Sequence, residues 1–221
     1  MSTLAVNNSR KIDPDGRSHD PEGVRRDIIA VATTEFAEKG LSGGRVDEIA
    51  ARTRTSKRMI YYYFGDKEGL FVAVLEAAYA RIRAIEGELD LAGMPPLDSL
   101  RKLTEFTFTY QNSNQDFVRL VMVENIHNGA HLARSETIQA LNVSVLNVLR
   151  DIYDRGVAQG VFRPGIDIID IHMTISALSF FNVSNRATFS LIFKRNMASR
   201  AALAKRRAVV ADTVLRFVCN A

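Results

Sequence analysis

The chain contains very little cysteine: Cys219 is the only one among its 221 residues. A disulfide framework or a zinc cluster built on cysteines is therefore excluded within one chain, which favours a reducing compartment. The first twenty residues lack the apolar run of a signal peptide. No stretch reaches 18 uninterrupted apolar residues, because Asn182, Asn185 and Arg186 interrupt the richest segment. We therefore expect a soluble cytoplasmic protein with no membrane span.

Neither sign of charge dominates the composition. Hydrophobic residues make up 47% of the chain and charged residues 24%, with a formal net charge of +4. A mildly basic balance permits nucleic-acid binding without requiring it, so the placement of the cations matters more than their total. A length of 221 residues is enough for one large or two modest domains, each with an apolar core.

Apolar residues recur at helical spacing along most of the chain, and no strand pattern or internal repeat stands out. We predict an all-α fold in which residues 1–19 form a flexible basic arm, 20–66 a helix-turn-helix domain, and 67–221 a larger helical domain for effector binding and dimerisation. Asp20 is expected to cap the first helix and Gly40 to end it. The other predicted helices span 45–52, 56–64, 67–88, 96–112, 115–128, 135–159, 167–189 and 199–219.

The segment TSKRMIYYYFGDK, residues 55–67, places cations and tyrosines side by side. On a helix, Ile60, Tyr63 and Phe64 share one face, which is predicted to be the inner one. Lys57, Arg58, Tyr61 and Tyr62 are then left for a partner. Lysine and arginine neutralise DNA phosphates, arginine also reads guanine edges, and a tyrosine hydroxyl can donate to a phosphate. The pattern fits DNA binding, although a tyrosine run also occurs in ordinary packing.

Four spaced sequence elements resemble the N-terminal domain of the TetR family of bacterial transcription regulators. They are Ala37–Gly40, VDEIAAR at 46–52, SKRMIYYYF at 56–64 and GDKEGLF at 65–71. Carried over, the resemblance assigns phosphate contacts to Tyr61, Tyr62 and Lys67, and places the recognition helix at Ser56, Lys57, Arg58 and Met59.

Two positions depart from the family pattern. Arg45 stands where a threonine commonly opens the second helix, so a cation replaces a cap, and we include it among the DNA-contacting residues. Arg54 stands where glycine or a similar residue is usual, and is expected to adopt a left-handed backbone conformation.

The resemblance implies a repressor that a small-molecule effector releases from a palindromic operator, with residues 67–88 linking the two domains. It implies no cofactor and no enzymatic activity. Effector cavities are mostly apolar with a few polar groups. Beside Phe117 and Phe180, the candidate lining residues are Phe106, Tyr110, Met122, Asn125, His127, His172, Phe181, Asn182 and Arg186.

Glu124, His127 and His131 could share one helical face, with His172 approaching from another helix. Glutamate and histidine at such spacing can bind a metal ion, which leaves open an all-α enzyme or metal-binding protein with a site near Glu124, His127 and His172. Against it, Asn128-Gly129 is typical of a helix end and would separate His131. The commonest outcome for such residues is a partly buried histidine bonded to a neighbour.

The last two predicted helices suit a homodimer. The helix from 167 is apolar on two faces, and 199–219 carries the stripe Leu203, Val210, Val214 and Phe217. A palindromic operator requires two recognition helices at matched spacing, which favours a two-fold dimer. The alternative is that both helices complete the core of a monomer.

Overall fold

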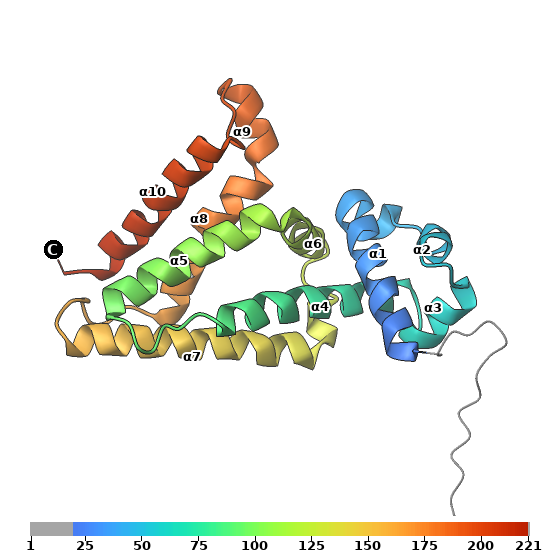
Figure 1. Cartoon of the computed structure of the whole chain (residues 1–221), viewed down its shortest axis with the longest axis horizontal. Helices are drawn as coiled ribbons and strands as arrows, with labels where there is room; N and C mark the ends of the chain where they lie inside the picture. The colour runs from blue at the N-terminus through green and yellow to red at the C-terminus, as the bar shows by residue number, and fades with distance from the viewer. Residues whose placement is uncertain (1–19, 221) are drawn as a thin grey trace, which may run out of the picture.

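A computed structural model describes residues 20–220, so the predicted arm at 1–19 lies outside the described residues. Within that range the regular secondary structure is helical, apart from an isolated bridge between Phe162 and Cys219, and turns and loops join the helices (Figure 1). The elements are α1 (Pro21–Gly43), α2 (Val46–Arg52), α3 (Lys57–Phe64), α4 (Lys67–Gly87), α5 (Pro96–Ser113), α6 (Gln115–Ile126), the 3-10 turn η1 (Leu132–Arg134), α7 (Glu136–Ala158), α8 (Ile168–Ser184), α9 (Arg186–Ile192) and α10 (Arg200–Val218).

The three N-terminal helices pack on the first turns of α4 to form a head at one end of the molecule (Figure 1). Phe36 of α1, Ile49 of α2, Ile60 of α3 and Phe71 of α4 are fully buried there. The rings of Phe36 and Phe71 meet edge to face, with centroids 5.4 Å apart. Because α2 and α3 have only seven and eight residues, their stability depends on this packing.

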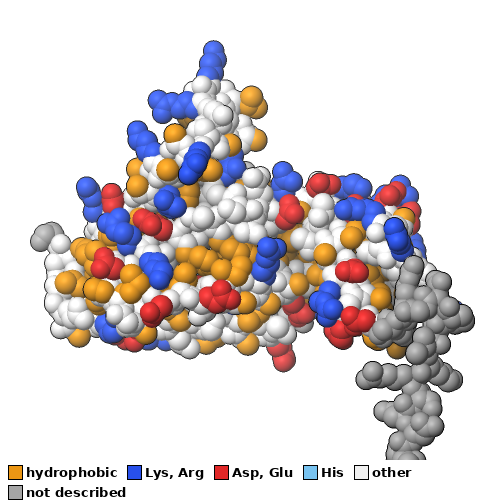
Figure 2. All heavy atoms as spheres, in the orientation of Figure 1, with side chains coloured by type: hydrophobic (Ala, Val, Ile, Leu, Met, Phe, Trp, Pro, Cys, Tyr) orange, Lys and Arg blue, Asp and Glu red, His pale blue; other side chains and the backbone are white. Residues whose placement is uncertain are grey.

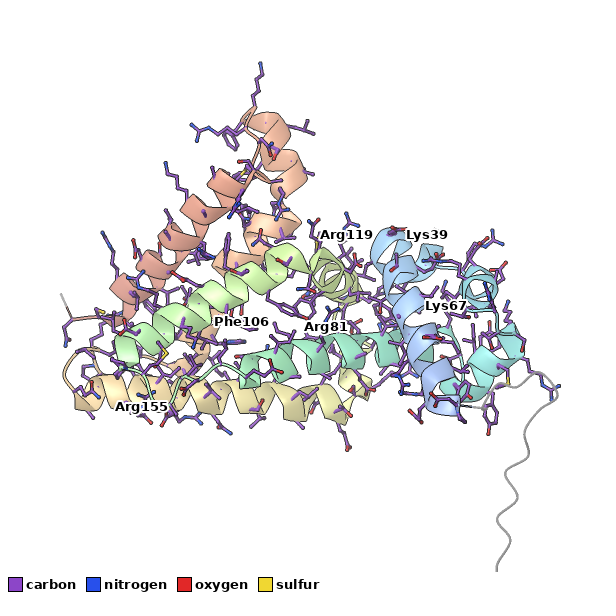
Figure 3. All side chains as sticks on the ribbon, viewed as in Figure 1. Lys39, Lys67, Arg81, Phe106, Arg119 and Arg155 are labelled. Atoms are coloured by element: carbon purple, nitrogen blue, oxygen red, sulfur yellow. The ribbon has the colours of Figure 1, made fainter. Side chains whose placement is uncertain are left out.

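Helices α4 to α10 build the core, which extends away from the head (Figure 1). Leu100 of α5, Leu149 of α7, Ile171 of α8 and Val214 of α10 meet in its main apolar cluster. Arg155 fixes the loop before α5 by donating to the carbonyls of Met94 (2.9 Å) and Leu91 (3.1 Å), at the end of the core far from the head (Figure 3). Among residues 20–220, no helix is long and apolar enough to cross a membrane.

Side-chain caps begin several helices where the sequence predicts them. Ser56, Asp66, Asp167 and Ser199 each accept a backbone N–H in the first turn of the helix that follows. The prediction for Asp20 was wrong, because its carboxylate accepts from Arg26 (3.3 Å) instead of capping α1. At this exposed helix start, the salt bridge to Arg26 occupies the Asp20 carboxylate, which therefore does not accept an N–H of the first turn.

Two predicted helices end differently in the structure. The helix predicted over 167–189 is two helices, because α8 ends at Ser184 and α9 begins at Arg186. Asn185 lies at the break, where its side chain bonds the Ser184 hydroxyl and competes with the helical backbone pattern. At Gly40 the backbone leaves the helical conformation, with a left-handed φ of 69°, as predicted; one further helical turn after this break extends α1 to Gly43.

Candidate DNA-binding surface and effector cavity

Helix α3 presents its predicted contact residues to solvent. Ser56 caps it by accepting the N–H of Met59 (3.2 Å), and Lys57 and Arg58 follow on the exposed surface. Ile60 is fully buried, whereas the side chain of Tyr62 is 79% exposed. This burial pattern matches the predicted inner and outer faces of the helix.

The three consecutive tyrosines divide between surface and core. Tyr61 is exposed, with the Lys57 ammonium 5.8 Å from its ring centre, and Tyr62 is exposed beyond it. Tyr63 is half-buried and packs against the apolar cluster of the head. The predicted split of two outer tyrosines and one inner tyrosine is therefore present in the fold.

Lys67 lies at the start of α4, next to the end of α1 (Figure 3). Its ammonium donates to the carbonyl of Ser42 (3.2 Å), so this cation also ties α4 to the segment before α2. The backbone N–H of Gly69 is satisfied by Asp66 Oδ1 (2.6 Å). Lys67 thus combines a partly exposed charge with a structural bond inside the head.

Arg45 precedes α2 and its side chain is occupied by a neighbour. Its Nη2 lies 2.6 Å from Asp47 Oδ2, and this hydrogen bond lowers the pKa of Asp47 to about 2. The Arg45 N–H donates to Glu35 Oε1 (3.1 Å), so a buried glutamate of α1 fixes the backbone at the start of α2. The sequence analysis did not identify Glu35, whose role depends on the packing of α1 against α2.

The buried carboxylate of Glu35 is surrounded by positively charged side chains of the head. Lys39 Nζ lies 2.7 Å from Oε1, and Arg52 Nη1 lies 3.8 Å from Oε2. Burial acts to raise the pKa of Glu35, but the bonds from Lys39 and Arg45 and the charge of Arg52 outweigh it, and the net pKa is lowered. The carboxylate is consequently ionised and holds α1 against α2.

The turn between α2 and α3 contains the predicted left-handed residue. Arg54 has φ of 53°, a conformation that costs a residue with a side chain more than it costs glycine. The expectation drawn from the departure at this position is confirmed. The turn keeps the helix-turn-helix geometry at the expense of local backbone strain.

The core encloses a cavity of about 270 Å³ between α4, α5, α6, α7 and α8. Of the sequence candidates, His172, Phe117 and Phe180 line it. Burial and the nearby Arg83 lower the pKa of His172, which favours its neutral form. The cavity therefore receives aromatic and polar side chains from several helices, as an effector site requires.

Four further cavity-lining residues carry hydrogen-bonding groups: Tyr79, Arg83, Glu86 and Gln111. Arg83 and Glu86 form an ion pair within α4, and burial raises the pKa of Glu86. The sequence analysis missed these residues. An arginine and a glutamate three positions apart on a helix are typical of an exposed pair, and only the packing of α5 and α8 over α4 encloses them.

Other predicted effector residues lie outside this cavity. Met122 and Asn125 are exposed on α6, and Phe106 lies on α5 with its ring centre 5.9 Å from that of Tyr110. Tyr110 lines a groove between the head and the core, where Arg81 and Arg119 also lie (Figure 3). His127 lines a surface hollow beside Lys67. Helical periodicity shows which residues share one face of a helix, but it does not specify which face lines a cavity.

Phe181, Asn182 and Arg186 line a separate, smaller pocket of about 160 Å³ beside Arg206. Asn182 donates to Asn112 Oδ1 (2.8 Å), and Arg186 donates to the same oxygen. This polar cluster ties the break between α8 and α9 to α5. The two side chains therefore have structural partners within the fold.

Of the glutamate and two histidines of ENIHNGAH, Glu124 and His131 form a buried pair. Helix α6 ends at Ile126, and left-handed Asn128 and Gly129 turn the chain back. The predicted separation of His131 was wrong, because this turn returns it to Glu124, with Nδ1 2.8 Å from Oε2. Across residues 20–220, no three histidine, cysteine or acidic side chains gather as metal ligands.

The alternative site near Glu124, His127 and His172 is not assembled. Glu124 is 1% exposed and also accepts the N–H groups of His131 and Leu132, each at 2.8 Å. His172 lines the interior cavity, whereas His127 lines the hollow beside the head. The three side chains therefore lie in different parts of the fold.

Helices α8, α9 and α10 form a C-terminal arm: α8 and α10 pack on α5, and the arm projects beyond the core at its α9 end (Figure 1). Space-filling spheres show apolar side chains on this arm among lysines and arginines (Figure 2). The exposed apolar residues include Ile169, Met173, Phe181, Leu191, Ile192, Phe193 and Val209. Of the predicted stripe on α10, Val210 and Val214 are instead buried, where α10 packs on α5 and α8.

Comparison with known proteins gives matches over both parts of the chain. Residues 28–74 match the model of the tetR family of bacterial regulatory proteins, and residues 96–214 match that of a tetracyclin repressor-like C-terminal domain. The HTH-type transcriptional repressor NicS of Pseudomonas putida is 36% identical over 90% of this chain and 94% of its own.

Two more proteins extend these similarities. An HTH-type transcriptional repressor of Streptomyces coelicolor is 32% identical over 63% of this chain and 70% of its own. The crystal structure of a tetR-family regulatory protein from Rhodococcus superposes with a TM-score of 0.69, at 23% identity, over 90% of this chain and 98% of that one. At that level of identity the superposition supports the fold alone.

Proposed function

This chain belongs to the TetR family of bacterial regulatory proteins, and we propose that it is a dimeric repressor that a small molecule releases from its operator DNA. The observation that carries the proposal is the exposed row of cations and tyrosines on α3, held in place by the buried Ile60. Binding to chromosomal DNA would place the protein in the cytoplasm and requires no enzymatic activity.

For the DNA contacts, we assign the recognition helix to Ser56, Lys57, Arg58 and Met59, and phosphate contacts to Tyr61, Tyr62, Lys67 and Arg45. Lys57 and Arg58 are exposed in the first turn of α3, the end that faces base edges in helix-turn-helix proteins. Arg45 must share its guanidinium with Asp47, so its contribution is expected to be smaller than that of Lys57.

The test is fluorescence anisotropy of the purified protein against the DNA upstream of its own gene, at two salt concentrations and with excess competitor DNA. Binding that survives the competitor supports a sequence-specific regulator. Weak binding that is abolished by competitor would indicate only a basic surface and would contradict the proposal for that fragment.

Variants on α3 connect that binding to the assigned residues. We expect Lys57→Ala and Tyr62→Phe to weaken operator binding by about tenfold each, and Lys57→Ala to reduce the salt dependence as well. Arg150→Ala removes an exposed cation of α7 and is the matched control. Unchanged binding in both folded α3 variants would refute the contact assignments.

For dimerisation, we assign the interface to the arm of α8 and α10. Ile169 and Met173 are each more than half exposed and lie one turn apart on α8, which supports an apolar face that a second copy covers. Analytical ultracentrifugation should show a dimer for the natural chain and a monomer for Met173→Asp. A folded Met173→Asp dimer would place the interface elsewhere.

For the effector, we assign the interior cavity lined by His172, Phe117, Phe180, Arg83, Glu86 and Gln111. Helix α4 contributes Arg83 and Glu86 to this cavity and Phe71 to the head, so a ligand that shifts α4 can change the orientation of the head. Such a ligand acts only through its different affinity for the two orientations.

A further inference from the structure

Two buried polar atoms on the cavity wall have no hydrogen-bond partner among residues 20–220. They are Nε of Arg83 and Oε1 of Gln111. A buried donor or acceptor without a partner destabilises the fold, and nearly all such groups in proteins are paired. Their occurrence together in one cavity indicates that a bound molecule completes them.

Two other polar side chains of the same wall already donate hydrogen bonds within the fold. The hydroxyl of Thr107 donates to the carbonyl of Leu103 (3.0 Å), and the amide of Asn142 donates to the carbonyl of Ile138 (2.9 Å). These bonds lie within single helices and leave both groups little to offer a ligand. The buried atoms without a partner on this wall therefore lie on α4 and α5.

The size and lining of the cavity restrict the shape of its ligand. Its 270 Å³ lies just below the range of roughly 300–1,000 Å³ typical of drug-sized ligands. Tyr79, Phe117 and Phe180 supply three aromatic rings, and Tyr79 and Phe117 pack edge to face with centroids 5.4 Å apart. One ring, or two fused rings, fits such a space and can stack or meet ring edges there.

We propose that the effector is a small aromatic compound with a hydrogen-bond acceptor for Arg83 Nε–H and a hydrogen-bond donor for Gln111 Oε1. The inference rests on the proposed function, in which this cavity is the effector site. Both side chains are long and flexible, so a turn about their terminal bonds brings the unpaired atoms to a ligand. The acceptor is either a neutral carbonyl or a carboxylate.

The Arg83–Glu86 pair distinguishes those two acceptors. A neutral carbonyl leaves the ion pair unchanged, whereas a carboxylate adds a second negative charge beside one buried cation. An anion would draw a proton onto His172, which lines the same cavity in its neutral form, or onto Glu86, whose pKa burial already raises. Carboxylate binding should therefore strengthen as the pH falls toward the pKa of either group.

The experiment is isothermal titration calorimetry of the full chain with three probes. 4-Hydroxybenzamide offers a donor and a neutral acceptor, 4-hydroxybenzoate offers a donor and a carboxylate, and toluene offers neither. We expect at least one hydroxylated probe to bind more tightly than toluene. In Gln111→Leu, which removes the unpaired oxygen, the affinity for that probe should fall roughly ten- to hundredfold, while toluene binding is retained.

Thr104→Val is the matched control, because Thr104 is buried on the same helix, bonds only to the carbonyl of Leu100 (2.7 Å) and does not line the cavity. Its probe affinities should equal those of the natural chain. Equal affinity of all three probes, or of the natural chain and Gln111→Leu, would overturn the proposed ligand class. So would the absence of binding by every probe.

Operator binding measured on the same samples separates this inference from the proposed function. Specific DNA binding without any dependence of probe affinity on Gln111 overturns the ligand class and leaves the repressor intact. Probe binding that depends on Gln111 in a chain that binds no operator supports the ligand class and contradicts the proposed function.

Discussion

The recognition helix α3 and the core of this protein use charged residues in opposite ways. Helix α3 places Lys57 and Arg58 in solvent, where they can reach a polyanion. The core instead buries Glu86 and Glu124 and provides each with a partner inside the fold. Exposed charges can be exchanged at little cost to stability, whereas buried ones are costly unless they are paired.

The head and the core meet at a contact that combines both kinds of interaction. His131, held by Glu124, packs edge to face on Phe71, with ring centres 5.2 Å apart, and Phe71 belongs to the apolar cluster of the head. On the surface nearby, Arg134 pairs with Glu68 at 2.9 Å. The buried pair is consequently the firmer link between the core and the head.

The largest effect is expected from breaking that link. Glu124→Ala removes the acceptor of three hydrogen bonds and leaves His131 buried, which should lower the free energy of unfolding by about 3–5 kcal/mol. Urea denaturation measures the loss, and Asp154→Ala, at an exposed site on α7, is the control. A loss as small as that of the control would mean that the buried pair does not hold the junction.

The second-largest effect on stability is expected where the end of α3 lies close to the start of α4. A Cβ on Gly69 would overlap the carbonyl oxygen of Phe64, so Gly69→Ala should destabilise by about 1–3 kcal/mol and weaken DNA binding. Gly87→Ala is the matched control, because nothing lies near its Cβ position at the end of the same helix. Thermal denaturation should separate the two variants; equal melting temperatures would contradict this account.

The contribution of the buried Glu35 carboxylate to the stability of the head can be tested by varying the pH. Because the folded-state pKa of Glu35 is lowered, its contribution is present above the ordinary glutamate pKa and is lost as the pH falls through the folded value. Glu35→Gln should therefore cost about 1–2 kcal/mol at pH 7 and progressively less below pH about 4.5. Denaturation curves from pH 7 to 3 measure this difference, which should not stay constant with pH.

The smallest effect is expected at the strained turn. Arg54→Gly relieves a left-handed residue and should stabilise the fold by about 0.5–1 kcal/mol. The same substitution at Arg52, the last residue of α2, should destabilise by about 1 kcal/mol, since glycine is a poor helix former and the charge that faces Glu35 is lost. A loss of stability in both variants would show that the turn is not strained.

The sequence predicted the head more completely than the core. The inner face of α3 follows from local spacing, and the left-handed conformation of Arg54 was expected from the resemblance to a family that usually has glycine there. In the core, His172 was predicted at the cavity, but Arg83 and Gln111 were not. Helical periodicity identifies an apolar face without indicating whether another helix will close over its polar edge.

Local sequence thus determined the all-helical fold, most helix starts and the exposed side chains of α3, because capping and amphipathic spacing act within a turn or two of the chain. Tertiary structure alone decided that Asn128 and Gly129 return His131 to Glu124, and that Glu35 binds the backbone N–H of Arg45 before α2. It also decided that Arg83 and Gln111 share one cavity. These arrangements join residues from separate helices, and their geometry depends on how the helices pack.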